Sequence, residues 1–119
     1  MKKISLIQNI IRIFGVIQLV MGAIFWTDHL DNLVIIHIIL GSVIAIGLFI
    51  LAIQAGKYGI SSWLVALSIV WAIGLPAWGL LQDKIFPGPY NWITQVLHLL
   101  CGVGAIGLSE MLGMKIKKS

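Results

Sequence analysis

One uninterrupted apolar stretch, Leu33 to Leu51, constrains the fold of this chain more than any other segment. It reads LVIIHIILGSVIAIGLFIL. About 20 residues, each rising about 1.5 Å, cross the hydrocarbon core of a bilayer, so the stretch is long enough to form a membrane-spanning helix. Its one ionisable residue is His37, and Gly41 follows one helical turn later on the same face.

The pattern of the first stretch recurs near the C-terminus, in ITQVLHLLCGVGAIGL, where Gly102 lies four residues after His98. The tetrapeptide AIGL also occurs in both runs. Two further apolar runs each carry a glycine near the corresponding end, Gly22 and Gly79. The chain therefore has the pattern of two duplicated helical hairpins, and parallel repeats of this kind are related by an axis along the membrane normal.

Composition excludes several classes of protein. The 119 residues are 60% hydrophobic and 10% charged, which is too few charges for the surface of a soluble domain. The net charge of +4 comes mostly from lysines at the two ends, so it indicates topology and lipid contact, with no nucleic acid partner. The single cysteine excludes an internal disulfide, and no group of residues suggests a nucleophilic or hydrolytic enzyme.

Hydropathy and turn residues divide the chain into four spans within one integral-membrane domain. The expected spans cover about residues 4–27, 33–54, 60–82 and 91–114. Pro76 falls inside the third span, where neighbouring helices can satisfy the freed carbonyl. Short connections make neighbouring helices antiparallel, so the expected fold is all-α, a four-helix transmembrane up-down-up-down bundle.

The distribution of basic residues predicts the orientation of the bundle. Both termini and the loop that holds Lys57 are basic, whereas the other two loops hold three aspartates and Lys84. Since lysine and arginine accumulate on the cytoplasmic side, we expect a multi-pass protein of the cell membrane with both termini cytoplasmic.

The two histidines are the strongest candidates for a functional site. An ionisable residue inside a span is costly and usually faces the bundle interior. The second and fourth helices run in the same direction, with His37 about four residues and His98 about seven residues from their outer ends. Their depths therefore differ by only a few ångströms, and we expect the two imidazoles to face each other in the outer half of the bundle.

Small residues share the helix faces that carry or oppose the histidines. Gly41 and Gly102 follow the histidines, and Gly22 and Gly79 lie on the other two helices at matching heights. These glycines fit a slot for a flat ligand, although small residues also allow membrane helices to pack closely with no ligand. Because they serve dimer contacts equally well, the sequence leaves homo-oligomer formation open.

A planar macrocycle held between two histidines is the arrangement of b-type haem. On His37-x-x-x-Gly41 and His98-x-x-x-Gly102, the chain resembles the four-helix membrane b-type cytochromes, in which histidines on two helices bind haem and glycines make room for it. Many relatives carry two histidines on each ligand helix, whereas this chain carries one. The resemblance implies one haem b per chain with His37 and His98 as its iron ligands, and an electron-transfer protein rather than an enzyme. Quinone or a redox partner would react at the outer surface.

Other uses of the histidines stay open. The pair fits a packing contact, or a proton or substrate site in a small transporter. A zinc or copper site would need His29 and Cys101 as further ligands. The chain also fits an accessory subunit of a larger membrane complex. It resembles the small multidrug transporters in size alone, and it lacks the glutamate that those proteins carry in their first helix.

Two polar contacts are expected inside the bundle. Arg12 and Glu110 lie toward the cytoplasmic side of the first and fourth helices, which are neighbours, so an ion pair would reduce the cost of burying either residue. The alternative is that Arg12 extends to a lipid phosphate. Gln18, Gln95 and Thr94 can each form a hydrogen bond between helices or orient a histidine through its other nitrogen.

Overall fold

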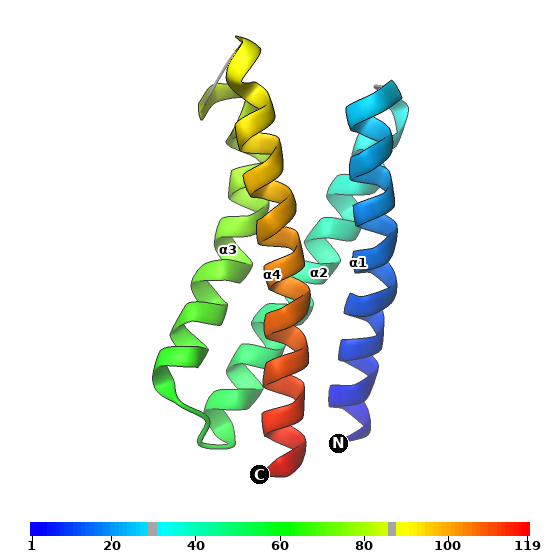
Figure 1. Ribbon diagram of the computed structural model, residues 1–119. Helices are drawn as coiled ribbons and strands as arrows, with labels where there is room; N and C mark the ends of the chain where they lie inside the picture. Colours follow the sequence, from blue (N-terminus) through cyan, green and yellow to red (C-terminus); the bar gives the residue numbers. More distant parts are fainter. Residues whose placement is uncertain (29–30, 86–87) are drawn as a thin grey trace.

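Four long helices form the molecule (Figure 1). The computed structural model describes residues 1–28, 31–85 and 88–119. The helices are α1 (Lys2–Asp28), α2 (Val34–Lys57), α3 (Ser62–Ile85) and α4 (Asn91–Lys118), with single 3-10 turns at Asp31–Leu33 and Gly88–Tyr90. No strand occurs in these three segments, and the all-α prediction is confirmed.

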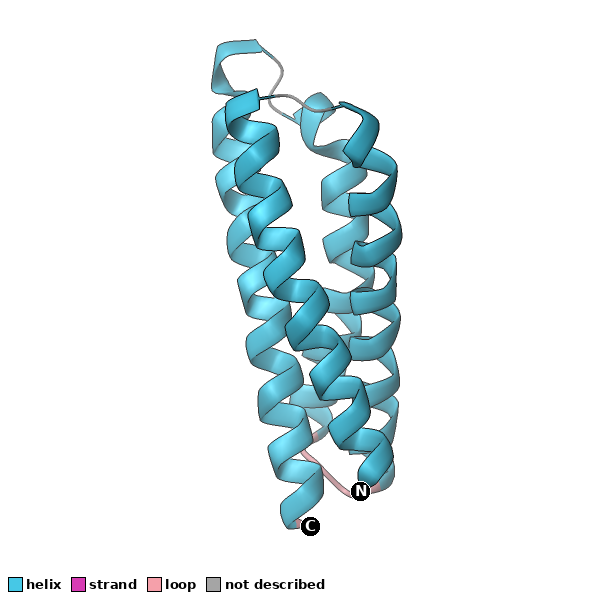
Figure 2. Ribbon diagram, turned by 90° about the vertical axis from the view of Figure 1, so that its right-hand side faces the viewer, coloured by secondary structure: helices cyan, strands magenta, loops and turns pink. Residues whose placement is uncertain are grey.

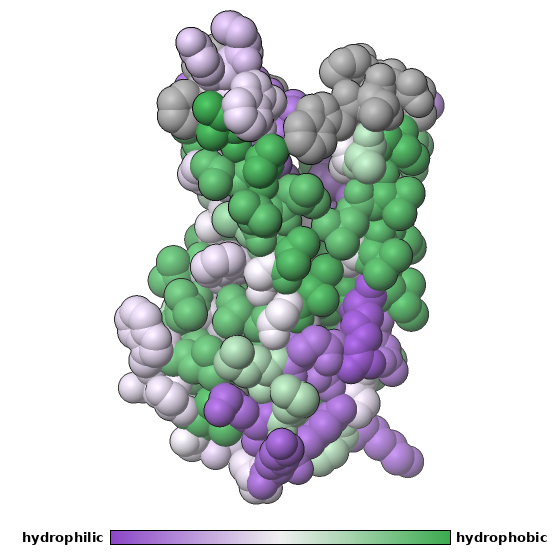
Figure 3. All heavy atoms as spheres, in the orientation of Figure 1, coloured by the Kyte–Doolittle hydropathy of each residue, from purple (hydrophilic) through white to green (hydrophobic). Residues whose placement is uncertain are grey.

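Each helix is long enough and apolar enough to cross a membrane. The shortest, α2 and α3, contain 24 residues and extend about 36 Å, which exceeds the roughly 30 Å hydrocarbon core of a bilayer. Large apolar side chains point outward along the helices; examples are Ile13, Val70 and Val103. Apolar residues cover most of the upper and middle surface in Figure 3. The chain is a multi-pass membrane protein.

Consecutive helices run in opposite directions, so the chain has the predicted up-down-up-down order and both termini lie at one end (Figure 1). A tight turn joins α2 to α3. Gly59 adopts a left-handed φ of 74°, which favours glycine. The amide of Ile60 then donates to the carbonyl of Ala55 over 3.0 Å and satisfies one of the last carbonyls of α2.

The contacts between the helices arrange them as a diamond in cross-section. Figure 2 shows the helices running side by side along the bundle. Each helix contacts its two neighbours around the bundle, and α2 also contacts α4 across the short diagonal. The two helices that carry His37 and His98 therefore pack directly against each other.

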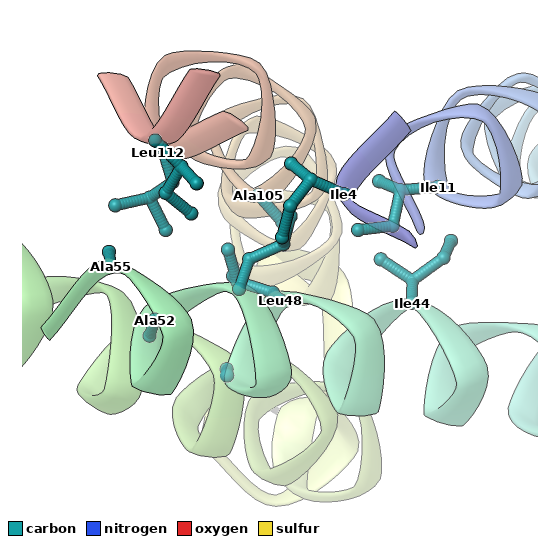
Figure 4. Close-up of a cluster of buried hydrophobic side chains, with 11 residues drawn as sticks. Ile4, Ile11, Ile44, Leu48, Ala52, Ala55, Ala105 and Leu112 are labelled. Carbon is teal, nitrogen blue, oxygen red and sulfur yellow. The ribbon is translucent and has the colours of Figure 1, made fainter. Parts of the chain in front are cut away.

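A buried apolar cluster fills the half of the bundle nearest the termini. Figure 4 shows Ile4 of α1 pointing toward Leu48 of α2 and Ile11 lying over Ile44, with Ala105 and Leu112 of α4 in the same cluster. Ile11, Leu48, Ala105 and Leu112 have no exposed surface. This cluster holds α1, α2 and α4 together at the end that carries both termini.

The helix ends differ from the predicted spans by a few residues. The α2 helix continues to Lys57 rather than ending near residue 54, and α4 continues to Lys118 rather than 114. The α3 helix begins at Ser62 and passes through Pro76 to Ile85.

Candidate functional site

The structure brings His37 and His98 together near the end of the bundle opposite the termini. His37 lies on the first turn of α2 and His98 on the second turn of α4, so the two parallel helices hold them at similar heights. Their ring centroids are 6.5 Å apart and the ring planes meet at 62°. Both side chains are partly buried.

The backbone at His37 is fixed by α1. Gln18 donates a hydrogen bond from Nε2 to the carbonyl oxygen of His37 over 2.8 Å. A Cβ at Gly41 would lie 2.9 Å from the same Nε2, so glycine at this position lets the Gln18 amide approach α2. Phe25 lies edge-on to the His37 ring, with the centroids 5.3 Å apart.

His98 packs against the backbone of α3. A Cβ at Gly79 would lie 2.9 Å from Cε1 and 3.3 Å from Nε2 of the imidazole, so the ring occupies the space that a side chain would need. One turn away, the Trp78 indole donates to the carbonyl of Thr94 over 3.1 Å. Further down α4, the Trp71 indole donates to the carbonyl of Cys101 over 2.8 Å. These contacts join α3 to α4 on both sides of His98.

The other two candidate glycines face open space. No heavy atom lies within 4 Å of a Cβ placed at Gly22 or at Gly102. Gly102 follows His98 by one turn, on the stripe of α4 that continues through buried Ala105 and Ser109. Gly22 lies one turn after Gln18 on α1. The open space therefore adjoins the histidine pair.

The separation of α1 and α4 changes along the bundle. Near the termini they pack closely: a Cβ at Gly15 would lie 2.6 Å from Cδ1 of Ile106. Toward the histidines the two helices diverge in Figure 1, and the space-filling surface in Figure 3 is notched between them.

Two observations fit a metal centre between the histidines. The Nδ1 atoms of His37 and His98 are buried and have no hydrogen-bond partner in the described part of the chain, which is costly for polar atoms. Imidazoles that bind one metal ion from opposite sides, at about 2.0–2.1 Å per bond and about 1.1 Å more to each ring centre, have centroids about 6.3 Å apart. The observed 6.5 Å is close to this value.

The four glycines divide into two pairs. Gly22 and Gly102 adjoin open space. The space at Gly41 and Gly79 is occupied by Gln18 and by the His98 ring. Glycine at positions 41 and 79 therefore lets the Gln18 amide and the His98 ring approach the neighbouring helix closely.

The predicted ion pair is confirmed. Arg12 donates from Nη2 to Oε2 of Glu110 over 2.7 Å and from Nε to Oε1, so the pair is bidentate. The same guanidinium donates from Nη1 to Oδ1 of Asn9 over 2.9 Å. The pair connects α1 and α4 in the half of the bundle near the termini, far from the histidines.

Sequence reasoning missed the contacts of the two tryptophans and of Gly79. Trp71 and Trp78 lie seven residues apart and so share a face of α3, a spacing that indicates a common partner helix. It does not reveal that both indoles donate to carbonyls of α4.

Across residues 1–28, 31–85 and 88–119, no three side chains of His, Cys, Asp or Glu gather as a metal-binding group. His29, the further ligand considered for zinc, lies outside the described residues. Comparisons of the chain with protein-family models, with curated proteins and with solved structures found no match.

Proposed function

We propose that this protein is a membrane b-type cytochrome that binds one haem b between His37 and His98 and transfers electrons. The observation that carries the proposal is the pair of imidazoles, one from each of two parallel helices, with centroids 6.5 Å apart. Their orphaned Nδ1 atoms and the open space at Gly22 and Gly102 support it.

Haem with a histidine on each side of its iron gains and loses single electrons and has no open position for oxygen chemistry. The chain's own residues hold this site. Gln18 fixes the backbone of His37, and Gly79 lets the His98 ring lie against α3. Apolar helix surface around the pair keeps the site dry, since the surrounding positions carry Phe25 and other hydrophobic side chains.

The proposal includes an orientation and a partner. We place the protein in the cell membrane with both termini cytoplasmic, because the lysines gather at the end of the bundle that carries them. The histidine pair then lies in the outer half. A quinone or a redox protein at the outer surface is the proposed electron partner.

An optical spectrum of the detergent-purified protein, oxidised and then reduced with dithionite, tests the proposal. We expect a Soret band with resolved α and β bands on reduction. His37→Ala and His98→Ala should each remove most of the bound haem, whereas His29→Ala, a change of the remaining histidine, should not. A colourless protein after expression with ample haem would overturn the proposal, as would an unchanged spectrum in both site variants.

A further inference from the structure

A second site lies at the opposite end of the bundle, between α1 and α4. A cavity of about 470 Å³ opens there, lined by Met1, Lys2, Ser5, Leu6, Asn9 and Lys117. We refer to it as the α1–α4 pocket. It contains two lysines, one from each helix, and no carboxylate. Figure 3 shows hydrophilic side chains gathered over this end of the two helices.

The charge of the pocket is balanced only in part, by an electrostatic interaction of Lys117 with Glu110. Glu110 is the nearest acidic side chain on α4, and Arg12 occupies both of its carboxylate oxygens. Neither Lys2 nor Lys117 forms an ion pair within the described residues. The two ammonium groups are therefore available for an anion at the pocket mouth.

Two polar side chains add hydrogen-bond donors to the pocket wall. The Oδ1 atom of Asn9 accepts from Arg12, so the amide is oriented with its Nδ2 group directed away from the guanidinium. Ser5 contributes a hydroxyl group one turn nearer the helix start. Ammonium, amide and hydroxyl donors around one cavity match the acceptor oxygens of a phosphate.

The location of the pocket favours a lipid as its ligand. The α1 helix has 27 residues and extends about 40 Å, so its first turns lie at the level of the lipid headgroups. From the pocket toward the other end of the bundle, one face of α1 carries exposed apolar side chains at seven-residue spacing. Leu6 and Ile13 are each 59% exposed and Val20 is 55% exposed. We call these three residues the apolar track. A phospholipid whose phosphate group lies in the pocket would place an acyl chain along this track.

We propose that the α1–α4 pocket binds the phosphate of an anionic phospholipid such as phosphatidylglycerol, with an acyl chain along Leu6, Ile13 and Val20. Basic pockets between helices at one membrane face bind anionic headgroups in this way. The site does not depend on the histidine pair, which lies at the other end of the bundle.

The test uses the purified protein in non-ionic detergent, titrated with phosphatidylglycerol or phosphatidylcholine, with bound lipid counted by native mass spectrometry. The pocket variant is Lys2→Gln/Lys117→Gln. The matched control is Lys57→Gln/Lys118→Gln, which removes the same charge at the same end of the bundle but leaves the pocket lining unchanged. Thermal unfolding with inorganic phosphate distinguishes a lipid site from a phosphate site.

We expect the pocket variant to bind phosphatidylglycerol roughly thirtyfold more weakly, on the basis of two surface lysines near an anionic headgroup. The control should retain binding, and phosphatidylcholine should bind weakly to every form. Equal loss in the pocket variant and the control would show diffuse attraction and overturn the proposal. So would full retention in the pocket variant, or protection by inorganic phosphate equal to that by the lipid.

Discussion

The variant Gly102→Val distinguishes two roles for the histidine pair, which are binding haem and forming a structural contact between helices. Gly102 adjoins His98 and faces open space, because no heavy atom lies within 4 Å of a Cβ placed on it. The protein without cofactor therefore accommodates Gly102→Val, whereas a macrocycle in that space would clash with the added methyl groups. Gly107→Val is the matched control, because Gly107 lies on the same helix, is exposed and also has open space at its Cβ.

The structure sets the size of both effects. Valine has a higher helix propensity than glycine by about 0.5 kcal/mol, so neither variant should destabilise the cofactor-free protein. Overpacking against a bound macrocycle costs about 1–3 kcal/mol, which corresponds to about fivefold to 150-fold weaker haem binding in Gly102→Val alone. Gly79→Ala should differ from both, because its Cβ would lie 2.9 Å from Cε1 of His98 and displace the ring even without cofactor.

The assay is a haem titration followed by the reduced-minus-oxidised difference spectrum, with thermal unfolding of the cofactor-free protein measured in parallel. Haem loss in Gly102→Val with retention in Gly107→Val supports the site. Full haem content and an unchanged spectrum in Gly102→Val would refute the reasoning, because the space beside His98 would then not be where the macrocycle lies.

Three further experiments test the packing of the bundle. In a double-mutant cycle followed by thermal unfolding, the double variant Arg12→Leu/Glu110→Leu should be destabilised by less than the sum of the two single variants; additive effects would contradict the ion pair. Gln18→Leu should cost about 0.5–1.5 kcal/mol by the same measurement, because the carbonyl of His37 loses a donor, and an unchanged unfolding midpoint would count against this bond. Gly59→Ala should cost about 1–2 kcal/mol because its φ is 74°; a neutral effect would show that the turn relaxes.

The sequence predicts the number, order and direction of the helices because hydropathy and short loops determine them. It places the ends less well. Hydropathy marks where a segment leaves the hydrocarbon, but the backbone continues as a helix through the headgroup region, where its hydrogen bonds remain favourable. Residues 55–57 therefore extend α2 to Lys57, and the lysine tail extends α4 to Lys118.

The pairing of the histidines follows from counting residues along two parallel helices, and the structure places the rings 6.5 Å apart. Their supporting contacts do not follow from such a count. Whether Gly79 faces a ligand or the ring of His98 depends on how far each helix is rotated and how closely the two approach. The sequence shows which face of a helix a residue lies on only to within about a third of a turn. The contacts of Gly79 and His98 depend on shifts of a few tenths of an ångström between helices.

The half of the bundle near the termini and the half near the histidines differ in packing. The buried apolar cluster and the Arg12–Glu110 pair lie near the termini, where α1 and α4 pack closely. Toward the histidines the same helices diverge, and Gly22 and Gly102 have no neighbour within 4 Å of a Cβ. Stability supplied by one half lets the other half hold orphaned imidazole nitrogens and open space without unfolding. Substitutions in the buried cluster near the termini should therefore change the unfolding midpoint, and substitutions that fill the open space, such as Gly102→Val, should change what the protein binds.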